Sequence, residues 1–134
     1  MRHNPTSEFT TYDFAAFMQR INAAEAQPTV DLFGHTLVKG TRENTAREIV
    51  SRAARGERTV VNFVNAHCVN TLYNDAGYRR ALEASDRILP DGSGMSLAAR
   101  MAGVELGENL NGTDLFPHIC EFAEYSGQAI FLLG

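Results

Sequence analysis

The sequence predicts an α/β fold in which a parallel sheet carries helices on both faces. Apolar runs of strand length alternate with segments whose apolar residues recur at helical spacing, and this alternation is typical of such folds. The run Val60–Val64 is apolar at four of five positions, as in a strand buried on both faces. The 134 residues suffice for one domain with a core of its own.

The first part of the chain predicts two helices on either side of a strand-like segment. Apolar residues at helical spacing indicate a helix over residues 12–26. Residues 30–39 are strand-like around Gly34, which fits two short strands or one bulged strand. Thr41 is expected to be the N-cap of a second helix, and Gly56 is expected to end it.

The middle of the chain predicts two more strands, each followed by helical segments. In chain order these elements are a strand over 58–65, helical segments around 69–73 and 78–82, a short strand over 87–89 and a helix over 95–103. Asn74 and Asp75 interrupt the pattern between the two helical segments.

The last part of the chain predicts a helix and a strand. Thr113 is expected to be the N-cap, with Asp114 in the first turn and Pro117 where a backbone N–H is dispensable. Residues 128–133 predict a final buried strand that ends at Gly134. A parallel strand usually leads into a glycine turn and a covering helix. We therefore favour the front part of a longer, truncated fold over the alternative of a complete domain.

Composition limits the classes of function. The net charge is −4 and the basic residues are scattered, which argues against nucleic-acid binding through phosphate neutralisation. Cys68 and Cys120 form no disulfide framework, which fits a reducing, cytosolic setting. With His67 and His118 they match no standard zinc spacing, so we expect no metal and no other cofactor. No secretory signal and no membrane-spanning run is present, while peripheral membrane contact stays open.

Three polar clusters are expected to meet at one rim of the sheet, because ligands of parallel sheets bind beyond the carboxyl ends of the strands. In the second cluster a carboxylate ends a strand, two glycines permit a sharp turn, and a helix start exposes its amide N–H groups. This combination suits a phosphate-bearing or nucleotide substrate. The clusters are Asn65-Ala66-His67, Asp91-Gly92-Ser93-Gly94 and Asn111-Gly112-Thr113-Asp114.

Each candidate residue also has a structural interpretation, and the local pattern leaves both open. Asp91 fits a general base, and it equally fits a turn residue that stabilises the bend. Asn65 fits a contact to a sugar or uracil group, and it equally fits a cap on the following helix. His67 fits a phosphate contact, although a histidine in a first helical turn is more often structural. Residues 111–114 resemble helix-capping chemistry first of all.

Residues 60–134 resemble the bacterial WecG/TagA/CpsF family of glycosyltransferases. Four pieces match in order and spacing, namely VVNFVNAH at 60–67, ILPDGSG at 88–94, LNGTDL at 110–115 and IFLLG at 130–134. The resemblance implies a Rossmann-like enzyme that transfers a sugar from a UDP-sugar to a lipid-linked saccharide. The sugar would be N-acetylmannosamine or its uronic acid, and the acceptor a saccharide on undecaprenyl diphosphate. The products would enter teichoic acid, common antigen, capsular polysaccharide or exopolysaccharide.

The resemblance also implies roles for single residues. Asp91 would be the catalytic base that deprotonates the acceptor hydroxyl. Substrate binding would fall to the remaining polar and glycine positions, Asn65, His67, Gly92, Ser93, Gly94, Asn111, Thr113 and Asp114. The chain departs from the family pattern at Phe63, where many members have threonine, and at Asn109, where many have an arginine that would suit a diphosphate.

These inferences define the expected organisation and partners. Residues 1–29 would form an N-terminal tail and helix, and residues 30–134 the front part of a single glycosyltransferase domain whose second half is missing. The expected partners are the UDP-sugar and the lipid-linked acceptor, with no nucleic acid, at a cytoplasmic location that includes the inner membrane face. Self-association stays open. The competing hypothesis is a truncated, catalytically silent remnant or a nucleotide-sugar-binding module.

Overall fold

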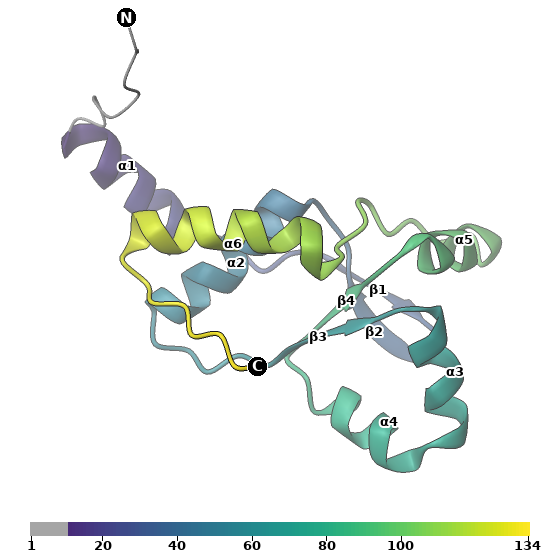
Figure 1. Ribbon diagram of the computed structural model, residues 1–134. Coiled ribbons are helices and arrows are strands. Elements are labelled where there is room, and N and C mark those ends of the chain that lie inside the picture. The colour runs from purple at the N-terminus through teal and green to yellow at the C-terminus, as the bar shows by residue number, and fades with distance from the viewer. Residues whose placement is uncertain (1–10) are drawn as a thin grey trace, which may run out of the picture.

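The computed structural model describes residues 11–134, so residues 1–10 of the expected N-terminal tail lie outside the described part. Its helices and strands alternate broadly as predicted (Figure 1). The elements are α1 (Thr11–Asn22), β1 (Thr29–Leu32), β2 (His35–Val38), α2 (Arg42–Ala54), β3 (Val61–Val64), α3 (Ala66–Asn74), α4 (Ala76–Glu83), β4 (Arg87–Pro90), α5 (Ser93–Met101) and α6 (Gly112–Ser126).

The strands form two pairs rather than one full parallel sheet. β1 and β2 make an antiparallel hairpin, whose turn at Phe33 and Gly34 has positive φ at both residues. The expectation of two short strands around Gly34 is therefore confirmed. β3 and β4 are parallel, with Val61 opposite Arg87 and Val64 opposite Pro90. The hairpin lies beside β4 but shares no ladder with it, so the Rossmann-like sheet is present only as the β3–β4 pair in the described part.

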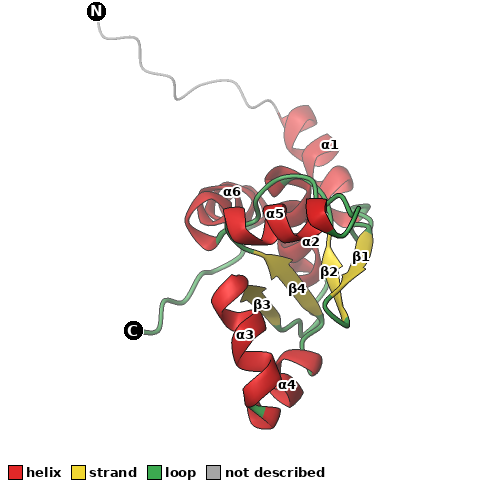
Figure 2. Ribbon diagram, turned by 90° about the vertical axis from the view of Figure 1, so that its right-hand side faces the viewer, coloured by secondary structure: helices red, strands yellow, loops and turns green. Residues whose placement is uncertain are grey.

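The predicted buried strand at residues 128–133 is wrong. This segment is a loop that leads away from the helices in Figure 2, and the side chains of Phe131 and Leu133 are 93% and 95% exposed. A strand needs a neighbour to pair its backbone N–H and C=O groups. Within residues 11–134 no strand pairs with this segment. The apolar pattern alone could not show whether such a neighbour exists.

Helices cover both faces of the strands, because consecutive residues of a strand point to opposite sides. Leu37 and Ile88 join an apolar cluster with residues of α3, α4 and α5. Val38 and Leu89, the next residues along β2 and β4, join a second cluster with residues of α1, α2 and α6. Each fully buried leucine of this kind contributes about 1.5–3 kcal/mol to folding.

β3 is less buried than its apolar sequence predicted. Val64 is 2% exposed, but Phe63 is 37% exposed and Val60 lies outside the strand at 39%. The reason is that β3 has a neighbouring strand, β4, on one side only, whereas β4 also has β2 beside it. In the described part, the other backbone edge of β3 and part of one of its faces therefore lack a covering element. The expectation of a strand buried on both faces is therefore wrong for β3.

The predicted helix ends are right at α2 and wrong at α6. Thr41 caps α2, since its side chain accepts a hydrogen bond from the Asn44 N–H, and Gly56 follows the helix with a φ of +74°. α6 begins earlier than predicted, because its cap is Asn111 rather than Thr113. Pro117 consequently lies inside α6, where it removes one backbone hydrogen bond. α1 also ends at Asn22, four residues before the predicted end.

A buried carboxylate ties α2 to β4. The Glu48 side chain is 3% exposed, and its Oε1 accepts from Arg87 Nε at 2.6 Å and from Arg52 Nε at 3.0 Å. Its Oε2 accepts from the Gln27 backbone N–H at 2.6 Å, just before β1. The Glu48 side chain thus joins α2, β4 and the segment just before β1. Charge-assisted hydrogen bonds of this kind are worth more than neutral ones.

We expect Glu48→Gln to lower the free energy of unfolding by roughly 2 kcal/mol, because it leaves the partly buried Arg87 guanidinium without its carboxylate partner and leaves Arg52 with the longer, 3.6 Å pair to Glu57. Glu43→Gln is the matched control on the same helix. Within residues 11–134 Glu43 pairs with Arg47 alone, in an i,i+4 pair on the same helix, so its loss costs less than about 0.5 kcal/mol. Urea unfolding followed by circular dichroism measures both changes. Equal midpoints for the two variants would contradict the role given to Glu48.

Candidate functional site

The site begins with the parallel register of β3 and β4. Because Val64 lies opposite Pro90, both strands end at the same level. The Asp91 N–H donates to the Val64 carbonyl at 2.8 Å, which adds one more bond beyond the last paired residues. Asn65 and Asp91, the next residue after each strand, therefore stand at the same edge of the sheet.

Contacts between helix starts bring the three polar clusters together. A Cβ on Gly94 in α5 would stand 3.0 Å from the Cβ of Ala66 at the start of α3. A Cβ on Gly112 at the start of α6 would stand 3.6 Å from the Phe63 ring on β3. The Leu110 N–H donates to the Pro90 carbonyl at 3.2 Å. The first turns of α3, α5 and α6 thus meet at the carboxyl ends of the two strands.

Asp91 is held by its backbone, while its side chain is free. The peptide before it is fixed by the bond to Val64, and the peptide after it by the Gly92 N–H, which donates to Asn109 Oδ1 at 2.8 Å. Gly92 has a φ of +95°, which residues with a side chain rarely adopt. Within residues 11–134 the Asp91 carboxylate makes no hydrogen bond or ion pair, and the residue is half-buried.

Asn65 and His67 both lie at the start of α3. The Asn65 side chain accepts from the Cys68 N–H at 2.9 Å, so the capping interpretation is confirmed for this residue. His67 lies in the first turn, as expected from the sequence, and its side chain is exposed. Ser93 and Gly94 are the first two residues of α5, and Ser93 is exposed.

The third cluster is also engaged in structure. Asn111 Oδ1 accepts from the Asp114 N–H at 2.9 Å, and Asn111 Nδ2 donates to Asp114 Oδ2 at 2.8 Å. The same carboxylate oxygen pairs with Arg42 Nη1 at 3.0 Å. Asp114 therefore joins the start of α6 to the start of α2. Thr113 is exposed inside α6 and is not the cap.

Three residues that sequence reasoning did not place in the site complete the rim. Arg42 opens α2, and its backbone N–H and Nε both donate to Glu108 Oε2, at 2.8 and 3.2 Å. These bonds, the backbone one first, lower the pKa of Glu108 below its usual value of 4.5. The third residue, Asn109, directly follows Glu108 in the sequence and accepts the hydrogen bond from the Gly92 N–H. The one local signal for Arg42 was its position after the Thr41 cap, since its partners lie more than sixty residues away.

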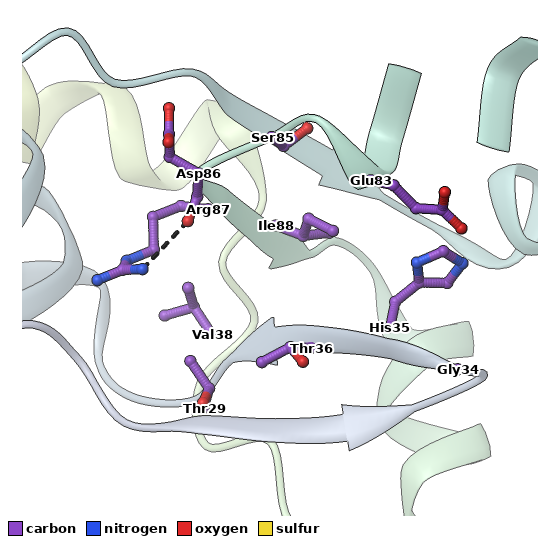
Figure 3. Close-up of a pocket in the computed structure, with 10 residues that line it drawn as sticks. All are labelled: Thr29, Gly34, His35, Thr36, Val38, Glu83, Ser85, Asp86, Arg87 and Ile88. Atoms are coloured by element: carbon purple, nitrogen blue, oxygen red, sulfur yellow. Dashed lines mark hydrogen bonds between the residues drawn. The ribbon is translucent and has the colours of Figure 1, made fainter. Parts of the chain in front are cut away.

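A hollow of about 270 Å³ lies at the other end of β4 (Figure 3). Asp86 and Arg87 line it at the amino end of the strand, together with His35 and Thr36 of the hairpin. Figure 3 shows one bond among the lining residues, from Arg87 Nη1 to the Asp86 carbonyl. This hollow is therefore separate from the rim that holds Asp91.

In the part of the chain that the structure describes, no group of three or more histidine, cysteine, aspartate or glutamate side chains could hold a metal ion. Among the helices of residues 11–134, none has the length and apolar character needed to cross a membrane.

Comparison with known proteins identifies the family. The family model described as "Glycosyl transferase WecG/TagA/CpsF family" matches residues 30–134. The chain therefore belongs to this family of glycosyltransferases, as the resemblance in the sequence predicted. The family places it in cell-surface polysaccharide synthesis, with a sugar donor and an acceptor as its general kinds of substrate. A comparison with curated proteins found no match.

We expect Glu108 to make the protein sensitive to acid. Because its pKa is lowered in the folded state, Glu108 contributes stability above pH 4.5, and this stability is lost as the pH falls through the folded pKa. Glu108→Gln should therefore show a smaller fall in the urea midpoint than the wild type when the pH drops below 4.5. Glu105→Gln, at a side chain that is 90% exposed, is the control and should behave as the wild type. Identical acid profiles for Glu108→Gln and the wild type would refute the assignment.

Proposed function

We propose that the protein transfers N-acetylmannosamine, or its uronic acid, from a UDP-sugar to a saccharide linked to undecaprenyl diphosphate. The observation that supports this proposal best is the half-buried Asp91 carboxylate, which has no partner in residues 11–134 and stands where three helix starts meet. The family supports sugar transfer in general. The particular donor and acceptor come from the resemblance alone.

In the proposed reaction Asp91 is the general base. The acceptor hydroxyl oxygen attacks the anomeric carbon, the bond from that carbon to the UDP oxygen breaks, and UDP leaves with the electron pair. The hydroxyl proton passes to the Asp91 carboxylate. Attack from the face opposite the leaving group inverts the anomeric centre. A base that is fixed at both neighbouring peptides suits this step, since its direction is set before substrate binds.

The surrounding helix starts suit the phosphate groups of the donor. The first turns of α3, α5 and α6 carry backbone N–H groups and the positive ends of helix dipoles. His67 and Ser93 are exposed there and are proposed substrate contacts, with Gly92 and Gly94 allowing close approach of the backbone. Asn65, Asn111, Thr113 and Asp114 are proposed to shape the pocket. The proposed location is cytoplasmic, at the inner face of the membrane where the lipid-linked acceptor is found.

We expect Asp91→Asn to lower kcat by roughly 10²- to 10⁴-fold, because the amide cannot take the proton. Binding of UDP should persist, since the change is isosteric. The assay is transfer of label from a UDP-sugar to a lipid-linked acceptor, with calorimetric titration of UDP in parallel. Asp31→Asn, at an exposed position on β1, is the control and should keep wild-type activity. Full activity in Asp91→Asn would remove Asp91 from the mechanism.

A module that binds nucleotide sugar without turnover is the second candidate. One observation favours it: Asn65, Asn111 and Asp114 are all engaged as caps or ion pairs, which leaves few polar side chains at the rim for substrate. Binding of UDP without transfer to any lipid-linked acceptor would support this candidate. Transfer by the wild type would exclude it.

A further inference from the structure

We infer that Asn109 is a positioning residue, which sets the direction of the Asp91 side chain through the Gly92 backbone N–H. The inference rests on the proposed function of Asp91 and goes further, because it gives a task to a residue that the proposed reaction leaves unused. The bond that carries it joins the Gly92 N–H to Asn109 Oδ1 at 2.8 Å.

The geometry explains why this bond acts on Asp91 in particular. The Gly92 nitrogen belongs to the same peptide group as the Asp91 carbonyl, so fixing that nitrogen fixes the ψ angle of Asp91. Its φ angle is fixed from the other side, where the Asp91 N–H donates to Val64 at 2.8 Å. With both angles set, the bond from Cα to Cβ points in one direction. The carboxylate is then left with its own side-chain rotations only.

Asn109 is itself held from both sides. The Glu108 N–H donates to the Gly40 carbonyl at 2.9 Å, beyond the end of β2. The Leu110 N–H donates to the Pro90 carbonyl at 3.2 Å, and the Leu110 side chain is fully buried. Asn109 therefore sits between two anchored residues, and its exposed side chain spans from this loop to the turn at Gly92. The ends of β2 and β4 therefore fix the position of Asn109, and Asn109 in turn fixes the backbone next to Asp91.

The residue type at position 109 matters for this role. Asparagine offers an acceptor oxygen to the Gly92 N–H, whereas arginine has donors only and no acceptor. An arginine here could contact a diphosphate but could not hold Gly92. The role inferred for Asn109 and a diphosphate-binding role for this position therefore make opposite predictions for Asn109→Arg.

The experiment compares four variants of the intact protein, Asn109→Ala, Asn109→Asp, Asn109→Arg and the control Asn70→Ala. Asn70 is an exposed asparagine on α3. The first readout is hydrogen exchange of the Gly92 amide by NMR, which does not depend on activity. We expect slow exchange in the wild type, Asn70→Ala and Asn109→Asp. Exchange should be about tenfold faster in Asn109→Ala and Asn109→Arg, which lack the acceptor.

The second readout is transfer from UDP-sugar to the lipid-linked acceptor. We expect Asn109→Ala and Asn109→Arg to lower kcat by roughly 10- to 100-fold, with KM for the donor within about twofold of the wild type, since the base is displaced and not removed. Asn109→Asp should recover most of kcat, because its carboxylate oxygen can accept from the Gly92 N–H.

The outcomes distinguish the positioning role of Asn109 from the proposed transfer activity with Asp91 as its base. Fast exchange of the Gly92 amide in the wild type, or unchanged kcat in Asn109→Ala, overturns the positioning role and leaves Asp91 as the base. A lower donor KM with undiminished kcat in Asn109→Arg also overturns it, in favour of a diphosphate contact. A wild type that binds UDP but transfers nothing overturns the proposed function, and the inference falls with it. Loss of exchange protection together with loss of kcat supports both.

Discussion

The parallel register of β3 with β4 is the constraint on which the rim depends. Val64 and Pro90 end their strands at one level, and the bond from the Asp91 N–H to Val64 carries the pairing past the last residues of the ladder. A shift of one residue in β4 would exchange Ile88 and Leu89 between the two apolar clusters. The buried side chains therefore enforce the register, and the register places Asp91 beside the start of α3.

Some polar residues of the rim hold the helix starts in place through hydrogen bonds, while others have side chains without a partner in the described part. Asn65 and Asn111 each satisfy a backbone N–H in the first turn of a helix, and Asp114 joins two helix starts through Arg42. These bonds fix the helix starts relative to the strand ends. Among the candidate residues in the described part, Asp91 combines partial burial with a carboxylate that has no partner. Structural use of its neighbours thus leaves the Asp91 carboxylate as the available one among them.

Helix caps and helix ends that depend on neighbouring residues were predictable from the sequence. Features that depend on contacts with distant parts of the chain were not. Thr41 and Gly56 bound α2 as expected, because a cap and a left-handed glycine act within one turn. Thr113 and Asn111 are both good capping residues, and the cap is Asn111, which directly follows the residue whose N–H bonds to the Pro90 carbonyl. The apolar pattern of residues 128–133 fits a strand, but a strand also requires a partner, which sequence periodicity does not supply.

The same limit applied to the site. The motifs placed Asp91 after its strand and Asn65 at the start of α3, because residue type and order sufficed. They did not reveal that Asn109 holds Gly92, since that bond depends on how the loop from 106 to 110 crosses the ends of β2 and β4. Arg42 and Glu108 were missed for the same reason, because each finds its partner across the fold.

The charges at the rim bear on the diphosphate donor that we propose. The charged side chains placed at the rim are three carboxylates, Asp91, Glu108 and Asp114, and one guanidinium, Arg42, which is already paired with two of them. Side chains alone would therefore repel a diphosphate. The opposing field comes from the starts of α3, α5 and α6, each worth roughly half a positive charge within its first turn. Three such ends at one place, together with Arg42, reduce the net charge of the rim from about −3 for the carboxylates alone to about −0.5. The convergence of the helices is thus as important to binding an anionic substrate as any single residue.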